Sequence, residues 1–121
     1  MTELIEMDGV LDDSSGEMSP SSVFSLLSND RRLRVIEILS NTDHRTIRGI
    51  ADEIARSETD GEPGAYDRKK SHISLYQCHM PKMDDAGIVE WDKRSGSVER
   101  GENYEHAHSI LNSVLSMYQN E

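Results

Sequence analysis

The sequence is poor in cysteine and in aromatic side chains, and it has no long apolar segment. Cys78 is the single cysteine among 121 residues, which excludes an intramolecular disulfide and a cysteine-rich zinc module. No window approaches the ~20 apolar residues of a membrane-spanning helix, and the N-terminus lacks the basic and then apolar pattern of a signal peptide. We therefore expect a cytoplasmic protein with no membrane partner.

Positive charge is scarce as well. The chain has 13 Lys and Arg against 23 Asp and Glu, and residues 1–20 account for -6 of the formal net charge of -10, which leaves -4 for the rest. Such an acid surplus with few lysines is typical of a molar-salt cytoplasm, as in haloarchaea. At about 1 M salt the Debye length is ~3 Å, so distant carboxylates hardly repel an anionic ligand. The ordinary alternative is that the acidity excludes nucleic acid as a ligand.

The domain organisation has three predicted parts. Residues 1–18 are acidic and lack apolar periodicity, which predicts a disordered tail. Residues 19–102 are expected to form one domain with a single core, since the chain length falls in the usual single-domain range. Residues 103–121 are expected to form a C-terminal helix.

Caps and apolar spacing predict three helices in the first half of the domain. Each begins at a residue type that favours a helix N-terminus: Ser19, Asn29 or Asp30, and Asp43 or Thr46. The third helix carries a stripe made of Ile47, Ile50, Ala51 and Ile54. Arginines at the start of the second helix could reach phosphate or remain solvated: Arg31, Arg32 and Arg34.

A fourth helix is predicted over residues 66–83, followed by two short strands. Its core-facing stripe is expected to be Ile73, Tyr76, Met80 and Met83. Pro81 should bend or interrupt the last turn, and residues 84–87 supply a C-terminal stop. Residues 88–91 and the segment around Val98 then predict a two-stranded hairpin. The fold class is therefore mainly α with a small β-hairpin.

This order of elements is that of a winged helix-turn-helix domain, in which the helix before the hairpin enters the major groove of DNA. Lysine and arginine can hold guanine or phosphate, while serine and glutamine can hydrogen-bond base edges. The predicted DNA-contacting residues lie on the fourth helix and at the hairpin tip: Arg68, Lys69, Lys70, Ser71, Ser74, Gln77, Lys93 and Arg94.

Two segments resemble known regulators. Residues 27–34, LSNDRRLR, look like the opening helices of archaeal winged-helix regulators. Residues 74–89, SLYQCHMPKMDDAGIV, are similar to the signature sLyhxHLPkLxdaGvV of a large haloarchaeal winged-helix family with ArsR-like members. The resemblance covers roughly residues 23–100, and it implies the winged-helix fold and DNA binding.

The C-terminal helix has an apolar stripe that repeats at spacings of three and four. We expect it to hold a homodimer through Tyr104, Ala107, Leu111, Val114, Leu115 and Tyr118. The alternative is that this stripe closes the core of the monomer.

The sequence as a whole predicts a sequence-specific, homodimeric DNA-binding repressor of transcription. The rival is a winged-helix module that modulates another regulator through protein contacts without binding DNA. No enzyme is expected, because the sequence has no phosphate loop, dinucleotide fingerprint or hydrolase elbow. No cofactor or metal is expected either, since His72 and His79 lie about 10 Å apart along one helix.

Overall fold

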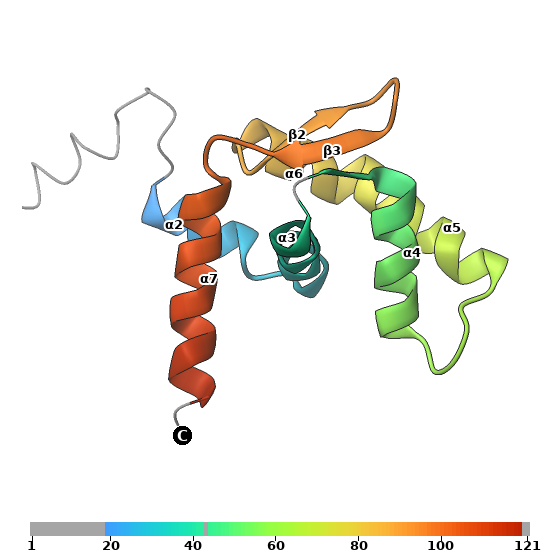
Figure 1. Cartoon of the computed structure of the whole chain (residues 1–121), viewed down its shortest axis with the longest axis horizontal. Helices are drawn as coiled ribbons and strands as arrows, with labels where there is room; N and C mark the ends of the chain where they lie inside the picture. Colours follow the sequence, from blue (N-terminus) through green and yellow to red (C-terminus); the bar gives the residue numbers. More distant parts are fainter. Residues whose placement is uncertain (1–18, 43, 120–121) are drawn as a thin grey trace, which may run out of the picture.

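The described residues of this computed structural model, 19–42 and 44–119, are mainly helical and include a small three-stranded antiparallel sheet (Figure 1). The predicted tail, residues 1–18, and the candidate cap Asp43 lie outside the described residues. The elements are, in order, α2 (Pro20–Leu26), α3 (Asp30–Asn41), β1 (His44–Thr46), α4 (Ile47–Glu58), α5 (Ala65–Ser74), the π-helical turn η1 (Leu75–His79), α6 (Met80–Asp85), β2 (Val89–Asp92), β3 (Ser97–Arg100) and α7 (Tyr104–Gln119).

Three of the predicted helix caps are confirmed. Oγ of Ser19 accepts a 3.2 Å hydrogen bond from the backbone N–H of Ser22 at the start of α2. Oδ1 of Asn29 accepts one of 2.9 Å from Arg31 in α3, and Oγ1 of Thr46 accepts one of 3.1 Å in α4. Each cap satisfies a backbone donor that the first helical turn leaves without a partner. Local sequence therefore fixes where these helices begin.

The sheet has the strand order β1-β3-β2, so β3 is its central strand. The predicted hairpin of β2 and β3 is present, with Gly96 at φ +80° in its turn. The strand β1 was not predicted. It pairs with β3 through Arg45 opposite Val98, and its last residue, Thr46, is the N-cap of α4. The strand β3 therefore pairs with β2 on one side and with β1 on the other.

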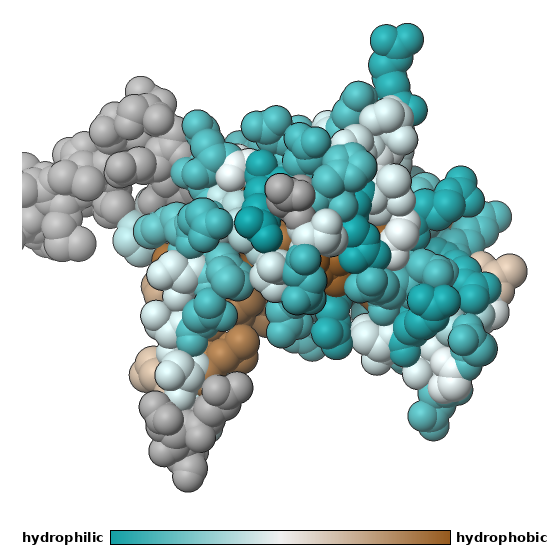
Figure 2. All heavy atoms as spheres, viewed as in Figure 1, coloured by the Kyte–Doolittle hydropathy of each residue, from teal (hydrophilic) through white to brown (hydrophobic). Residues whose placement is uncertain are grey.

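The core surrounds α3, which lies between α7 on one side and α4 with α5 on the other (Figure 1). The hydroxyl of Tyr104 in α7 donates a 2.6 Å hydrogen bond to the carbonyl of Ile36 in α3. Nε of Arg100 donates one of 2.8 Å to the carbonyl of Leu39, near the end of α3. Apolar residues of α7 also gather on the side that faces the body of the protein, where Figure 2 shows a brown surface.

The predicted buried side of residues 66–83 is wrong in its first half. Ile73 and Tyr76 are each 43% exposed, while Ser71 and Leu75 are buried. The backbone N–H of Met80 bonds to the carbonyl of Leu75, five residues back, in the π-helical turn before Pro81, which has no N–H to give. One extra residue in a turn rotates the preceding helix by about 100°, since a helix has 3.6 residues per turn.

The end of α6 follows the prediction. Gly87, which follows the C-cap Ala86, adopts φ +77°, and the N–H of Ile88 bonds to the carbonyl of Met83 at 2.9 Å. No helix in the described part of the chain combines the length and the apolar character that a bilayer crossing requires.

Candidate functional site

A continuous polar and apolar surface runs along the outer side of α5 and η1. We call it the exposed face of α5, and its residues are Tyr66, Lys69, Lys70, Ile73, Tyr76 and Gln77. These residues recur at spacings of three and four, which places them on one side of a helix. Tyr66 is 76% exposed. Three of the six large apolar side chains that are exposed in residues 19–42 and 44–119 belong to this face.

The two lysines of this face make no ion pair with any carboxylate of the described residues. Arg68, which was predicted to join them, is paired with two carboxylates of the protein, although its side chain is 43% exposed. Its Nε donates to Asp52 of α4 at 2.5 Å, and its Nη2 lies 3.6 Å from Glu62. Arg68 therefore fixes α5 against α4, and the free positive charge of the face comes from Lys69 and Lys70.

Neither of the two serines that were predicted to contact DNA is fully exposed. The prediction for Ser71 is wrong, because this residue is only 1% exposed. Ser74 is half-buried and accepts a 2.8 Å hydrogen bond from Nη1 of Arg31. The same guanidinium forms two 2.8 Å bonds with Glu58, and these hold the pKa of the Glu58 carboxyl below its usual range. Gln77 remains exposed.

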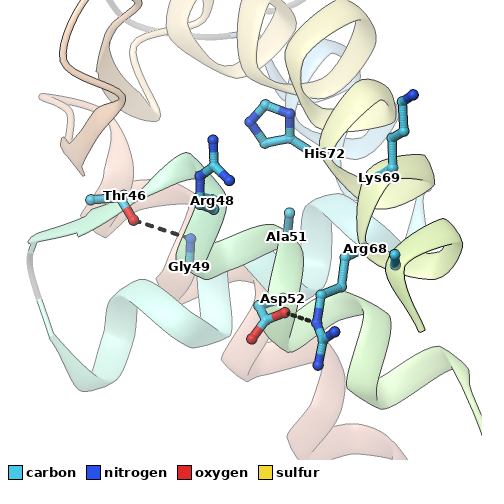
Figure 3. A pocket seen from close by; sticks show the side chains of 9 residues that line it. Thr46, Arg48, Gly49, Ala51, Asp52, Arg68, Lys69 and His72 are labelled. Carbon is cyan, nitrogen blue, oxygen red and sulfur yellow. Dashed lines mark hydrogen bonds and ion pairs between the residues drawn. The ribbon is translucent and has the colours of Figure 1, made fainter. Parts of the chain in front are cut away.

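A cleft of about 720 Å³ separates α4 from α5 (Figure 3). Arg48 and His72 extend into it from the two helices, and Lys69 lies along its outer edge. Asp52 is the acidic residue in its lining, and that carboxylate is already paired with Arg68. The cleft is therefore suited to an anion. Sequence reasoning missed Arg48, although its place in the first turn of α4, outside the apolar stripe, was a usable signal.

The hairpin is joined to the exposed face of α5 by an aromatic contact. Tyr76 packs edge-on against Trp91 of β2 at a ring-centroid distance of 5.1 Å, and Nζ of Lys93 lies 5.4 Å from the Trp91 ring. The buried indole N–H of Trp91 has no hydrogen-bond partner among the described residues. Lys93 and Arg94 are exposed at the tip, where Oδ1 of Asp92 accepts a 3.0 Å bond from the N–H of Arg94.

The other histidine of the fourth helix belongs to the interior. His79 is 4% exposed and lies 3.1 Å from Arg32, which is also buried. The sequence left open whether the arginines at the start of the second helix reach phosphate or remain solvated. Arg32 is buried in the core, and Arg34 pairs with Glu37 on the surface. In the described ranges, no group of three or more His, Cys, Asp and Glu side chains could hold a metal ion.

The predicted dimer residues divide into two sets. The prediction is wrong for Tyr104, Ala107 and Leu111, which are 1%, 0% and 5% exposed and close the core of the monomer against α3. Val114 and Leu115 are half-buried, and Tyr118 is 73% exposed. Leu111 and Leu115 also line a groove with residues of α3 and α4. The apolar surface that α7 leaves exposed therefore lies in its C-terminal half.

The fold and the site define a small helical domain with a basic, partly apolar helix beside a hairpin whose tip carries Lys93 and Arg94. The family model described as "Domain of unknown function (DUF7344)" matches residues 24–99, which is more than half of the chain, and the protein belongs to that family. The matched segment includes α5, η1 and β2, ends within β3, and does not reach α7. No curated protein matches the chain, and no solved structure does.

Proposed function

We propose that this protein is a winged helix-turn-helix regulator of transcription that binds double-stranded DNA, of the haloarchaeal, ArsR-like kind. The element order from α3 to β3 supports this reading, with α4 and α5 as the helix-turn-helix and the hairpin of β2 and β3 as the wing. The observation that carries the proposal is the exposed face of α5. Its two lysines form no ion pair among the described residues, and the face contacts the hairpin through Tyr76 and Trp91.

Each part of the surface has a role that its chemistry suits. The major groove is about 12 Å wide and admits one helix, so α5 enters it with Lys69, Lys70 and Gln77 toward the base edges. Arg48 and His72 in the cleft between α4 and α5 hold one stretch of phosphate. Lys93 and Arg94 at the tip of the hairpin contact the backbone on the other side.

A homodimer follows from the apolar surface left on α7. Val114, Leu115 and Tyr118 would meet their counterparts across a two-fold axis, together with Met117, which is 70% exposed. A two-fold dimer presents two copies of α5, and these read half-sites about one helical turn apart. Repression by blocking the polymerase is the simplest mechanism for such a protein. Molar salt in the cytoplasm would screen its net charge.

Two observations favour a second function. Arg68 is paired with Asp52, and the exposed face of α5 includes three apolar side chains, Tyr66, Ile73 and Tyr76. Exposed apolar patches also mark protein docking surfaces. The rival is therefore a winged-helix module that binds another regulator through this face.

Selection from a library of random-sequence duplexes, in buffers with and without molar KCl, tests the proposal directly. Fluorescence anisotropy on a selected duplex would then compare the wild type with Lys69→Glu and Lys70→Glu. We expect each variant to lose at least about tenfold in affinity, because a favourable contact with the polyanion becomes a repulsive one. The melting temperature should hardly change, since both lysines are exposed.

Lys82→Glu is the matched control. Lys82 is a surface lysine of α6 that also lacks an ion pair within the described residues, but it lines a surface next to α2. Lys82→Glu changes the net charge by the same amount as Lys69→Glu. Its loss of affinity therefore measures the part that comes from net charge alone. Equal losses for Lys69→Glu and Lys82→Glu would remove α5 from the DNA contact.

A further inference from the structure

Ile73 lies in the middle of the exposed face of α5. Its helical neighbours three and four residues away are Lys69, Lys70, Tyr76 and Gln77. The side chain is 43% exposed, although isoleucine is a residue type that normally fills a core. A β-branched residue also gains nothing from the helix itself, since its rotamers are restricted there. The folded protein covers more than half of this residue, and the exposed remainder is an apolar surface available to a ligand.

The surroundings of Ile73 restrict what this apolar group can meet. Lysines lie on the preceding turn and a glutamine amide on the next, and no acidic residue belongs to the exposed face of α5. The nearby ring of Tyr76 is already held against Trp91 at 5.1 Å. A ligand for this face must therefore combine negative charge on its flanks with a small apolar group between them.

Double-stranded DNA offers that combination in its major groove. Phosphates line both sides of the groove, and thymine alone among the four bases presents a methyl group there. We infer that Ile73 contacts the 5-methyl group of a thymine and makes α5 select an A·T pair at that position. This inference rests on the proposed function, and it specifies which base pair α5 prefers.

Gln77 agrees with the same base pair. It follows Ile73 by four residues, which is one helical turn, and a glutamine amide matches the N6 and N7 groups of adenine. One turn of α5 thus carries both an apolar contact for thymine and a polar contact for adenine. Contacts of this kind also weaken less with salt than ion pairs do, which suits a chain with a net charge of -10.

The test uses the full chain and duplexes selected from the random library. Each thymine of a selected duplex is replaced in turn by uracil, which removes only the 5-methyl group, and the dissociation constant is measured for the wild type and for Ile73→Ala. We expect uracil at one position of each half-site to weaken wild-type binding about fourfold, the equivalent of ~0.8 kcal/mol for one buried methyl group. Ile73→Ala should bind the thymine duplex more weakly and show no difference between thymine and uracil there.

Phe24→Ala is the control for loss of an exposed apolar side chain. Phe24 is 58% exposed on α2, away from the exposed face of α5, so this variant should keep the wild-type response to uracil. Melting temperatures of all three proteins establish that the comparison is between folded molecules.

The outcomes separate this inference from the proposed function. If duplexes bind through Lys69 and Lys70 but the wild type tolerates uracil at every position, or if Ile73→Ala keeps the wild-type response, the inference is wrong and the proposed function stands. If the protein retains no duplex from the library, both are wrong, and an acidic protein partner becomes the ligand of this face.

Discussion

Nη1 of Arg32 lies 3.1 Å from Nδ1 of His79, and both side chains are buried where α3 meets the turn before α6. A guanidinium has donors but no acceptor, so Nδ1 of His79 accepts this bond and its proton resides on Nε2. Burial, together with the positive charge of Arg32, lowers the pKa of His79 below its ordinary value of 6.5. The folded protein therefore holds this histidine in the neutral form.

This pair predicts a loss of stability in mild acid. In the unfolded chain His79 takes up a proton near the ordinary histidine pKa of 6.5, while the folded protein resists it. The unfolded state thus binds more protons below that pH, and the free energy of unfolding should fall by up to about 1.4 kcal/mol per pH unit as pH decreases below 6.5. Urea denaturation between pH 7.5 and pH 5.5 measures it.

His79→Gln isolates the contribution. The amide oxygen of glutamine can still accept the hydrogen bond from Arg32, but it cannot titrate. Measurements above pH 5 exclude an effect of Glu58. Folding lowers the pKa of its carboxyl, so the stability that Glu58 contributes decreases only below the ordinary glutamate pKa of 4.5. An identical pH slope for His79→Gln and the wild type would show that this residue is not the source.

Gly101→Ala should destabilise the fold. A Cβ atom at this position would collide with the carbonyl group of Gly87, because the N–H of Gly101 bonds to the carbonyl of Ile88 at 2.8 Å and brings the two segments together. Such overpacking typically costs about 1 to 3 kcal/mol, and we expect about 2 kcal/mol or more here.

Gly64→Ala is the matched control for that substitution. Its added Cβ would meet only Asp67, at 3.9 Å, so the change at this helix cap should cost less than about 1 kcal/mol. Chemical denaturation of both variants compares them. Equal midpoints for Gly101→Ala and Gly64→Ala would contradict the close approach of the two backbone segments.

Removing the cations of the hairpin should weaken DNA binding without changing its sequence preference. Lys93→Ala and Arg94→Ala are expected to lose affinity by similar factors on selected and on random duplexes, since phosphate contacts carry no sequence information. The slope of log affinity against log salt should become shallower by about one for each cation removed. A change in the selected sequence itself would place these residues at base edges.

Tyr118→Asp tests the association of two chains. If the C-terminal half of α7 forms the interface, a charge at this 73% exposed position should convert a dimer into a monomer without affecting the core residues Tyr104 and Leu111. Light scattering in molar KCl reports the mass. Glu105, an exposed residue at the other end of α7, supplies the control Glu105→Lys, which should leave the mass as it is. A wild-type mass equal to one chain would exclude this dimer.

Local signals in the sequence predicted much of the helical framework. The caps at Ser19, Asn29 and Thr46 and the spacing of Ile47, Ile50 and Ile54 are properties of a few neighbouring residues, and the structure agrees with them. The strand β1 escaped prediction because three residues are too few to show a period. Its pairing depends on β3, more than 50 residues further along the chain.

Features that depend on tertiary contacts were the ones predicted wrongly. The alternation of Ile73, Tyr76, Met80 and Met83 satisfies a regular helix, but the π-helical turn rotates the first two away from the core. The stripe on α7 was predicted to bind a partner chain, with the monomer core as the alternative, and three of its residues proved to be core. Of the predicted contact residues, Lys69, Lys70, Gln77, Lys93 and Arg94 are exposed.

The position of Trp91 provides a fluorescence signal at the contact between η1 and the hairpin. Trp91 is the only tryptophan of the chain, and its ring contacts both the phenol of Tyr76 and the ammonium group of Lys93. Intrinsic fluorescence excited in the indole band therefore has a single emitter, located where the helix and the hairpin meet. Any ligand that draws Lys93 away or shifts Tyr76 would change that emission, so the protein can be titrated without an attached dye.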